Sequence, residues 1–159
     1  MKIDKLFYFR ILLLIWILGI NLLLQITQIE FGWVIFISNI MLFVMSGDVN
    51  KNFISVEVGG LVGLLFAGAM VFIIGILQPI VGQVASVMIP LTVVLFVIIL
   101  LNPVMPMLFN NVGFAYFTCA LISAENFIMN FGEVIMIYLI GSVFVNGVCI
   151  ALLKQFIEV

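Results

Sequence analysis

Few residues of this chain could do chemistry, and histidine is absent from the whole sequence. Ser-His and Cys-His catalytic pairs and histidine-containing metal sites are therefore excluded. The chain also has no Gly-x-Ser-x-Gly motif, no P-loop and no dinucleotide-binding fingerprint. The two cysteines, Cys119 and Cys149, are expected to pack as apolar side chains and not to form a disulfide. We expect no enzyme activity, no metal site and no cofactor.

Glu57 is the most informative charged residue. The sequence predicts that it lies about one turn inside the third apolar helix, four to five residues past the helix cap. A carboxylate within a bilayer is costly and usually faces a cavity or a partner. Two interpretations stay open. Either Glu57 reaches back to the cytoplasmic interface and pairs with Lys51, or it takes part in solute binding or proton coupling.

Uncharged polar residues give a second group of candidates. Asn111 and Thr118 are seven residues apart, so they share a face of the predicted fifth helix. That face could offer hydrogen bonds to a solute; the alternative is hydrogen bonding between helices, worth about 0.6 kcal/mol on average. Asn21, Gln83 and Asn146 are weaker candidates for buried polar residues with a function. The predicted path for a solute comprises Glu57, Asn110, Asn111, Thr118, Ser38 and Asn39.

Glycines form a smooth stripe on the same helix as Glu57. Gly59, Gly63 and Gly68 recur at helical spacing and include a Gly-x-x-x-Gly step. Small residues allow backbones to approach closely where lipid supplies no hydrophobic drive. We therefore predict that this stripe packs against another helix, either within the protomer or between protomers.

The composition decides which elements must position these residues. The chain has 159 residues, of which 67% are hydrophobic and 8% charged, against about 45–50% and about 25% in soluble domains. The net charge of −2, with no basic patch, gives no sign of a nucleic-acid partner. The composition predicts an all-α integral membrane protein with lipid as its solvent.

The spacing of charges predicts about six transmembrane helices. Residues 11–29, 31–47, 58–124 and 134–153 contain no Asp, Glu, Lys or Arg, and one crossing needs about 20 residues. The longest run can hold three helices, divided at Gln78-Pro79 and Asn102-Pro103, because proline disfavours a continuous helix. The predicted spans are 6–26, 31–46, 53–78, 80–102, 104–123 and 133–153.

The cations predict the orientation. Six crossings place Lys2, Lys5, Arg10, Lys51 and Lys154 on one side, and Glu30, Glu125 and Glu133 in the turns on the other. Basic residues concentrate in cytoplasmic loops. The sequence therefore predicts a multi-pass protein of the cell membrane, the inner membrane in bacteria, with both termini in the cytoplasm.

A weak internal repeat divides the predicted single domain, residues 1–159. Gly32-Trp33-Val34-Ile35-Phe36 returns as Gly113-Phe114-Ala115-Tyr116-Phe117, and each block leads to a polar turn and a helix with an acid near its start. Three helices in each unit, 6–78 and 80–153, give a 3+3 inverted repeat. The middle helices, near 31–45 and 104–123, are short or broken. In transporters this points to the binding site; the alternative is that they are two ordinary short helices.

The same blocks resemble a known family. The Gly-aromatic-x-x-Phe blocks at 32–36 and 113–117, the polar turn Ser46–Asn52 and the Pro106-x-x-Phe109 lead-in resemble the YcdZ-type small inner-membrane proteins of bacteria, whose domain is of unknown function. More distantly, the turn and the Gly-rich helix look like the membrane domain of fusaric-acid and aromatic-acid exporters. That group usually has a basic residue where this chain has Glu57.

Two classes of function are carried forward. The first is a small channel or secondary transporter for a small neutral or weakly acidic solute, forming a homo-oligomer in the lipid bilayer. The second is a non-transporting scaffold or partner subunit of a larger membrane complex. Polar residues that converge on a water-accessible lumen favour the first, and polar residues buried singly against neighbouring helices favour the second.

Overall fold

The computed structural model describes residues 5–156, so Lys2, one of the predicted cytoplasmic cations, lies outside the described residues. This part of the chain is all-helical, with no strands. The elements are α1 (Lys5–Ile26), α2 (Trp33–Val44), α3 (Val49–Val81), α4 (Gln83–Leu101), α5 (Asn111–Ile122), α6 (Ala124–Met129), α7 (Phe131–Ile137), the π-helical turn η1 (Tyr138–Ser142) and α8 (Val143–Phe156).

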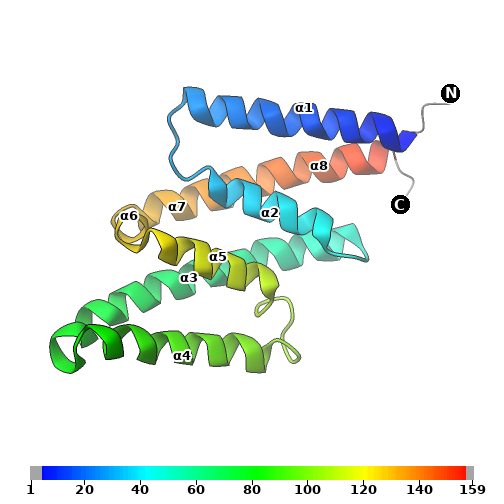
Figure 1. Ribbon diagram of the computed structural model, residues 1–159. Helices are drawn as coiled ribbons and strands as arrows, with labels where there is room; N and C mark the ends of the chain where they lie inside the picture. The colour runs from blue at the N-terminus through cyan, green and yellow to red at the C-terminus, as the bar shows by residue number, and fades with distance from the viewer. Residues whose placement is uncertain (1–4, 157–159) are drawn as a thin grey trace.

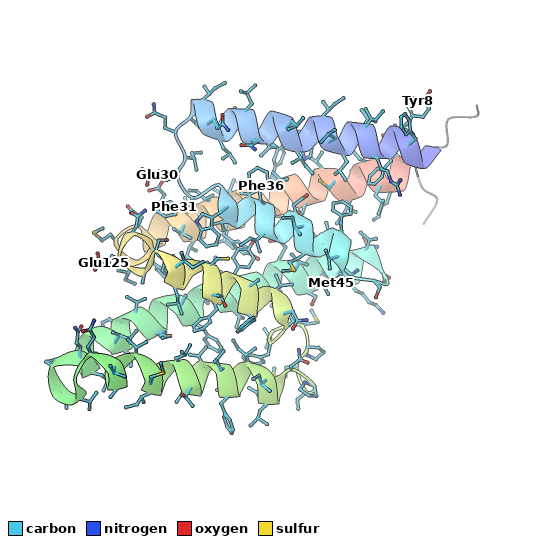
Figure 2. The ribbon with its side chains drawn as sticks, viewed as in Figure 1. Tyr8, Glu30, Phe31, Phe36, Met45 and Glu125 are labelled. Atoms are coloured by element: carbon cyan, nitrogen blue, oxygen red, sulfur yellow. The ribbon has the colours of Figure 1, made fainter. Side chains whose placement is uncertain are left out.

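The long elements run back and forth along one common axis (Figure 1). α1 packs on α8, α4 packs on α3, and α2 and α5 contact each other and lie between these outer pairs. The start of α1 and the end of α8 lie at the same end of the bundle (Figure 1). Turns at the opposite end join α1 to α2 and α3 to α4, and Glu30 and Glu125 lie there (Figure 2).

Four helical stretches are long and apolar enough to cross a membrane: Phe7–Ile26, Val49–Val81, Gln83–Leu101 and Phe131–Gln155. The last of these joins α7, η1 and α8 into one continuous helix. α2 and α5 are apolar but have 12 residues each. At about 1.5 Å per residue such a helix is about 18 Å long, well short of a ~30 Å hydrocarbon core.

α3 begins earlier than the predicted residue 53. Asp48 is its N-cap, and the Asp48 side chain accepts hydrogen bonds from the backbone N–H groups of Asn50, at 2.8 Å, and Lys51, at 3.3 Å. The N–H groups of Lys51 and Asn50 also hold the pKa of the Asp48 carboxyl below its usual range. A side chain that satisfies the free N–H groups of the first turn fixes where a helix starts. Glu57 therefore lies about 13 Å into α3, and not one turn from its cap as the sequence predicted.

The predicted break at Gln78-Pro79 is wrong by a few residues, because α3 continues through Pro79 to Val81. The chain reverses at Gly82, whose φ of 81° is a conformation that side chains with a Cβ rarely adopt. Its N–H closes the helix on the carbonyl of Gln78. Pro79 removes only one backbone N–H from the last turn of α3, so the helix continues past it. The reversal of the chain depends on Gly82 instead.

The predicted break at Asn102-Pro103 is confirmed, since α4 ends at Leu101. The next helix starts at Asn111 and not at 104. Pro103 and Pro106 lack the N–H groups that a helix would need, and the segment between them forms turns. Asn102 closes these turns by donating from Nδ2 to the carbonyl of Phe109 at 2.6 Å.

Candidate functional site

Glu57 is the centre of a buried polar cluster. Its Oε1 accepts a hydrogen bond from Asn146 Nδ2 at 2.7 Å, and its Oε2 lies 2.6 Å from Ser142 Oγ. Tyr138 donates from its hydroxyl to the backbone carbonyl of Glu57 at 2.7 Å. Tyr138, Ser142 and Asn146 are at most 1% exposed. The carboxyl group of Glu57 on α3 is thus held by the continuous last helix, and the Glu57 side chain is half-buried.

The cluster extends to α2 through amide groups. Asn146 Oδ1 accepts a hydrogen bond from Asn39 Nδ2 at 3.1 Å, and the second hydrogen of that Asn39 amide points to Cys149 Sγ, also at 3.1 Å. Cys149 is a buried free cysteine. Three helices, α2, α3 and α8, are therefore joined by side-chain hydrogen bonds around Glu57.

Two tyrosines complete the wall of the cluster. Tyr116 of α5 donates to the backbone carbonyl of Val34 in α2, and its ring meets the ring of Tyr138 edge to face at 5.1 Å. The approach of Tyr138 to α3 depends on Gly60, because a Cβ there would lie 2.4 Å from the Tyr138 hydroxyl. Ser38 is fully buried beside this wall and donates to its own helix at the Ile35 carbonyl, at 2.8 Å.

The last helix is irregular at the cluster. Tyr138 and Ser142 are the first and last residues of η1, the π-helical turn between α7 and α8. Single π-helical turns inside α-helices are rare and are frequent at functional sites. This turn places both side chains against Glu57 from one side.

The interpretation in which Glu57 pairs with Lys51 finds no support in the described residues. Both carboxyl oxygens contact the last helix, and no ion pair of Glu57 occurs between residues 5 and 156. Lys51 is exposed at the start of α3. The cation of the last helix, Lys154, donates instead to Asn50 Oδ1 at 2.8 Å.

The predicted path residues do not all meet. Asn39 joins the Glu57 cluster, and Ser38 is buried at its edge. Asn111 and Thr118 lie on the exposed face of α5, where Thr118 donates to its own helix at the Phe114 carbonyl, at 2.9 Å. The face shared by these two residues therefore points away from the bundle core.

Asn110 is a structural cap in this arrangement. Its Oδ1 accepts from the backbone N–H groups of Val112 and Gly113, both at 3.0 Å. Its Nδ2 lies 3.0 Å from the Ser55 carbonyl of α3. The side chain thus starts α5 and ties that start to α3.

Replacement of Asn110 by alanine is expected to destabilise the protein by about 1–2 kcal/mol, because it removes the N-cap and its link to α3. The neighbouring Asn111→Ala variant is the matched control, since Asn111 is exposed. Thermal unfolding of the two purified variants in the same detergent measures the difference. Equal melting temperatures for the two variants would contradict the capping role.

The glycine stripe lies where two backbones cross. A Cβ on Gly63 would be 2.1 Å from the backbone oxygen of Gly113 in α5, and one on Gly59 would be 2.3 Å from Asn110 Oδ1. A Cβ on Gly68 would be 2.7 Å from the ring of Phe131. The stripe therefore packs within the protomer, mainly against α5.

Five cavities of about 310 to 430 Å³ lie in the surface, and Glu57 lines none of these five. The most polar one, about 410 Å³, lies at the turn between α1 and α2. Gln28, Glu30, Phe31, Asn130 and Glu133 line it. The Glu57 cluster is thus set apart from these five cavities, and the Glu57 side chain is half-buried.

Sequence reasoning missed most of the partners of Glu57. Tyr138, Ser142, Asn146 and Cys149 are spaced by four, four and three residues, which places them on one face of the last helix. Small polar side chains at this spacing in an apolar run are the signal that could have found them. Of these, Asn146 was predicted from the sequence only as a weak candidate and Cys149 only as a packing residue, while Asn21 and Gln83 are exposed.

Comparison of the chain with protein-family models, with curated proteins and with solved structures finds no match. The fold therefore defines the class: an all-helical chain whose long apolar helices fit a membrane protein. Within that class, its particular feature is the carboxylate of α3 enclosed by the last helix.

Proposed function

We propose that the protein is a small secondary transporter or channel of the cell membrane, with six crossings, for a small neutral or weakly acidic solute. The observation that carries the proposal is Glu57, a half-buried acidic side chain of the apolar bundle, held by buried polar residues of the last helix with no cation beside it in the described residues. Such residues are costly in a membrane and mark solute, ion or proton pathways. The likeness to YcdZ-type membrane proteins remains part of this proposal.

The alternating course of the helices supports six passes through the bundle, in which α2 and α5, with 12 residues each, do not span the hydrocarbon core by themselves. The chain reverses direction at each step from α1 through α2, α3, α4 and α5 to the last helix, and the start of α1 and the end of α8 lie at the same end of the bundle (Figure 1). Tyr8 and Met45 lie toward that end, and Glu30 and Glu125 toward the other (Figure 2). With the bundle axis as membrane normal, the basic end faces the cytoplasm by the positive-inside rule.

Part of the helix packing supports the 3+3 inverted repeat, while the packing of α2 on α3 has no counterpart of similar extent between α5 and the last helix. In such a repeat, α1 corresponds to α4, α2 to α5, and α3 to the last helix. The packing of α1 on α8 should then have a counterpart in the packing of α4 on α3, and both contacts are present. The same correspondence leaves the central contact between α2 and α5 unchanged. The repeat boundary would then fall at Gly82, and the site of Glu57 and Ser142 lies between the two units. This is where inverted-repeat transporters bind their substrates.

The second candidate is a non-transporting membrane subunit. The outward position of Asn111 and Thr118 favours it, because a continuous polar path past these residues and Glu57 is not formed. In this case the cluster would serve to join helices, and homo-oligomers or partner proteins would cover the exposed apolar faces. A flux measurement separates the two candidates.

Replacement of Glu57 by glutamine is expected to reduce proton-coupled solute flux in proteoliposomes to that of protein-free vesicles. Glutamine keeps the size of the side chain but cannot gain or lose a proton at pH 7. Flux is measured for a panel of small neutral and weakly acidic solutes, with and without a pH gradient. Glu133→Gln, exposed at the other end of the bundle, is the matched control and should retain full flux.

Absence of flux for every solute with folded wild-type protein would reject transport and leave the subunit role. Flux that is unchanged in Glu57→Gln would remove this residue from the mechanism.

A further inference from the structure

The hydroxyl of Ser142 lies between two oxygen atoms. Its Oγ is 2.6 Å from Glu57 Oε2 and 2.6 Å from the backbone carbonyl oxygen of Tyr138. Ser142 is fully buried. A serine hydroxyl has one hydrogen, and a hydrogen bond needs that hydrogen near the line between donor and acceptor. One hydrogen therefore serves only one of these two contacts well.

A count of the available hydrogen atoms shows which group must supply the hydrogen for the other contact. The Tyr138 carbonyl can only accept, and an ionised Glu57 can only accept. With a carboxylate, one of the two short contacts would bring two oxygen atoms together with no hydrogen between them. With a carboxylic acid, Glu57 Oε2 donates to Ser142 Oγ, and Ser142 donates to the Tyr138 carbonyl. Each contact then holds one hydrogen.

We infer that Glu57 is a proton-binding site and that this structure is its proton-bound state, with the acidic hydrogen on Oε2 directed at Ser142. The inference goes beyond the proposed transport, because it concerns the ligand of this carboxyl group whether or not a solute moves. The ligand is a single proton.

The other oxygen of Glu57 fits this assignment. Oε1 accepts from Asn146 Nδ2 at 2.7 Å, as the carbonyl oxygen of an acid does. The orientation of the Asn146 amide is fixed because its own oxygen accepts from Asn39 Nδ2 at 3.1 Å. The second hydrogen of the Asn39 amide serves Cys149 Sγ. The acidic hydrogen, the Ser142 hydroxyl hydrogen and both amide hydrogens of Asn39 thus have acceptors when Glu57 is an acid.

Within residues 5–156, no Lys or Arg side chain lies beside Glu57 to stabilise a carboxylate. The uncharged wall of the cluster is formed by Tyr138 on η1 and Tyr116 on α5, with Cys149 on α8 behind Asn39. In α2 and α4 there is no titratable residue, and Cys119 is a free thiol on α5. The charged groups of α3 and of the elements packed on it are exposed: Lys51, Glu125, Glu133 and Lys154.

Proton release has a defined structural consequence. When the O–H bond of Glu57 breaks and its proton passes to water, the hydroxyl of Ser142 must turn toward the new carboxylate. The Tyr138 carbonyl in η1 then loses the hydrogen bond that it accepts from Ser142. The charge of Glu57 is therefore coupled to the π-helical turn by one hydroxyl rotation.

Infrared spectroscopy of the wild-type protein in lipid vesicles tests the inference. A protonated carboxyl group has a C=O stretching band distinct from the two carboxylate bands. We expect that band at neutral pH, its loss in Glu57→Gln and its retention in Glu133→Gln. In Ser142→Ala we expect it at higher frequency, because the acid loses its acceptor. Absence of the band in the wild type, or its persistence in Glu57→Gln, would overturn the inference.

Thermal unfolding gives a second, independent readout. Glutamine can copy the acid, since its Nε2 donates to Ser142 and its Oε1 accepts from Asn146, whereas it cannot accept at both positions as a carboxylate does. Glu57→Gln should therefore melt close to wild type, while Glu57→Ala should melt clearly lower. A Glu57→Gln protein as unstable as Glu57→Ala would also overturn the inference. Wild-type protein with the infrared band but without flux would reject only the transport proposal.

Discussion

Replacement of Gly63 by alanine is expected to destabilise the protein by about 3 kcal/mol, at the upper end of what an added core methyl group costs. The new Cβ would lie 2.1 Å from the backbone oxygen of Gly113 in α5. A backbone carbonyl cannot turn aside as the end of a long side chain can. The two helices must therefore separate, and close packing is the main force that holds helices together in lipid.

The backbones of α3 and α5 are also in contact at a second point of this crossing. A Cβ on Gly113 would be 2.7 Å from the backbone oxygen of Gly59, so the two helices are in backbone contact on both sides. Their separation would also pull Asn110 from the Ser55 carbonyl, 3.0 Å away. Loss of the α5 cap would then add to the cost of the clash.

Gly75→Ala is the matched control for Gly63→Ala. Gly75 lies in the same helix, and a Cβ there would meet nothing within 4 Å. Its melting temperature should equal or exceed that of the wild type, because alanine favours a helix over glycine by roughly 0.5–1 kcal/mol. Both variants are compared by thermal unfolding in one detergent. A Gly63→Ala protein as stable as Gly75→Ala would contradict the backbone contact between α3 and α5.

Replacement of Asn146 by leucine is the second change with a large expected effect, a loss of about 2–4 kcal/mol. A single polar contact between membrane helices is worth about 0.6 kcal/mol on average. Asn146, however, serves two buried groups at once, Glu57 Oε1 and Asn39 Nδ2. A buried polar group left without a partner costs about 1–3 kcal/mol. Since leucine is similar in size, the loss reports on hydrogen bonding and not on a cavity.

Asn21→Leu is the control for Asn146→Leu. Asn21 is an exposed residue of α1 whose side-chain oxygen accepts from Gln25 at 3.3 Å. Its replacement should change the melting temperature little. In the double variant Asn39→Leu/Asn146→Leu, part of the stability should return, because the Asn39 amide no longer seeks a partner. If the double variant loses the full sum of the two single losses, the hydrogen bond between the asparagines contributes nothing.

The run lengths between charges were enough to predict an all-helical chain with long apolar helices. The break at Asn102-Pro103 was also predictable, because the missing N–H of proline does not depend on the tertiary structure around it. The break at Pro79 and the start of α3 were misplaced. In both cases the end of the helix depends on one local group, the Gly82 backbone or the Asp48 side chain, that outweighs the general rule.

The site was predictable only in part. A carboxylate inside an apolar run drew attention to Glu57 from its type alone. Asn111 and Thr118 drew attention by sharing a helix face, but periodicity does not say whether a face meets a neighbour or the surface. In a chain apolar on all sides, the usual contrast between a polar outer face and an apolar inner face is missing.

Glu57 thus shows what each level of organisation determined. The sequence by itself determined that this protein is built of apolar helices and that one acid lies within them, because composition and spacing decide how much charge a segment can carry into lipid. Only the tertiary structure decided that Ser142 and Asn146 enclose this acid. These residues are more than eighty positions from Glu57 along the chain, and the glycine crossing of α3 and α5 and the approach of Tyr138 at Gly60 set the distances between the helices.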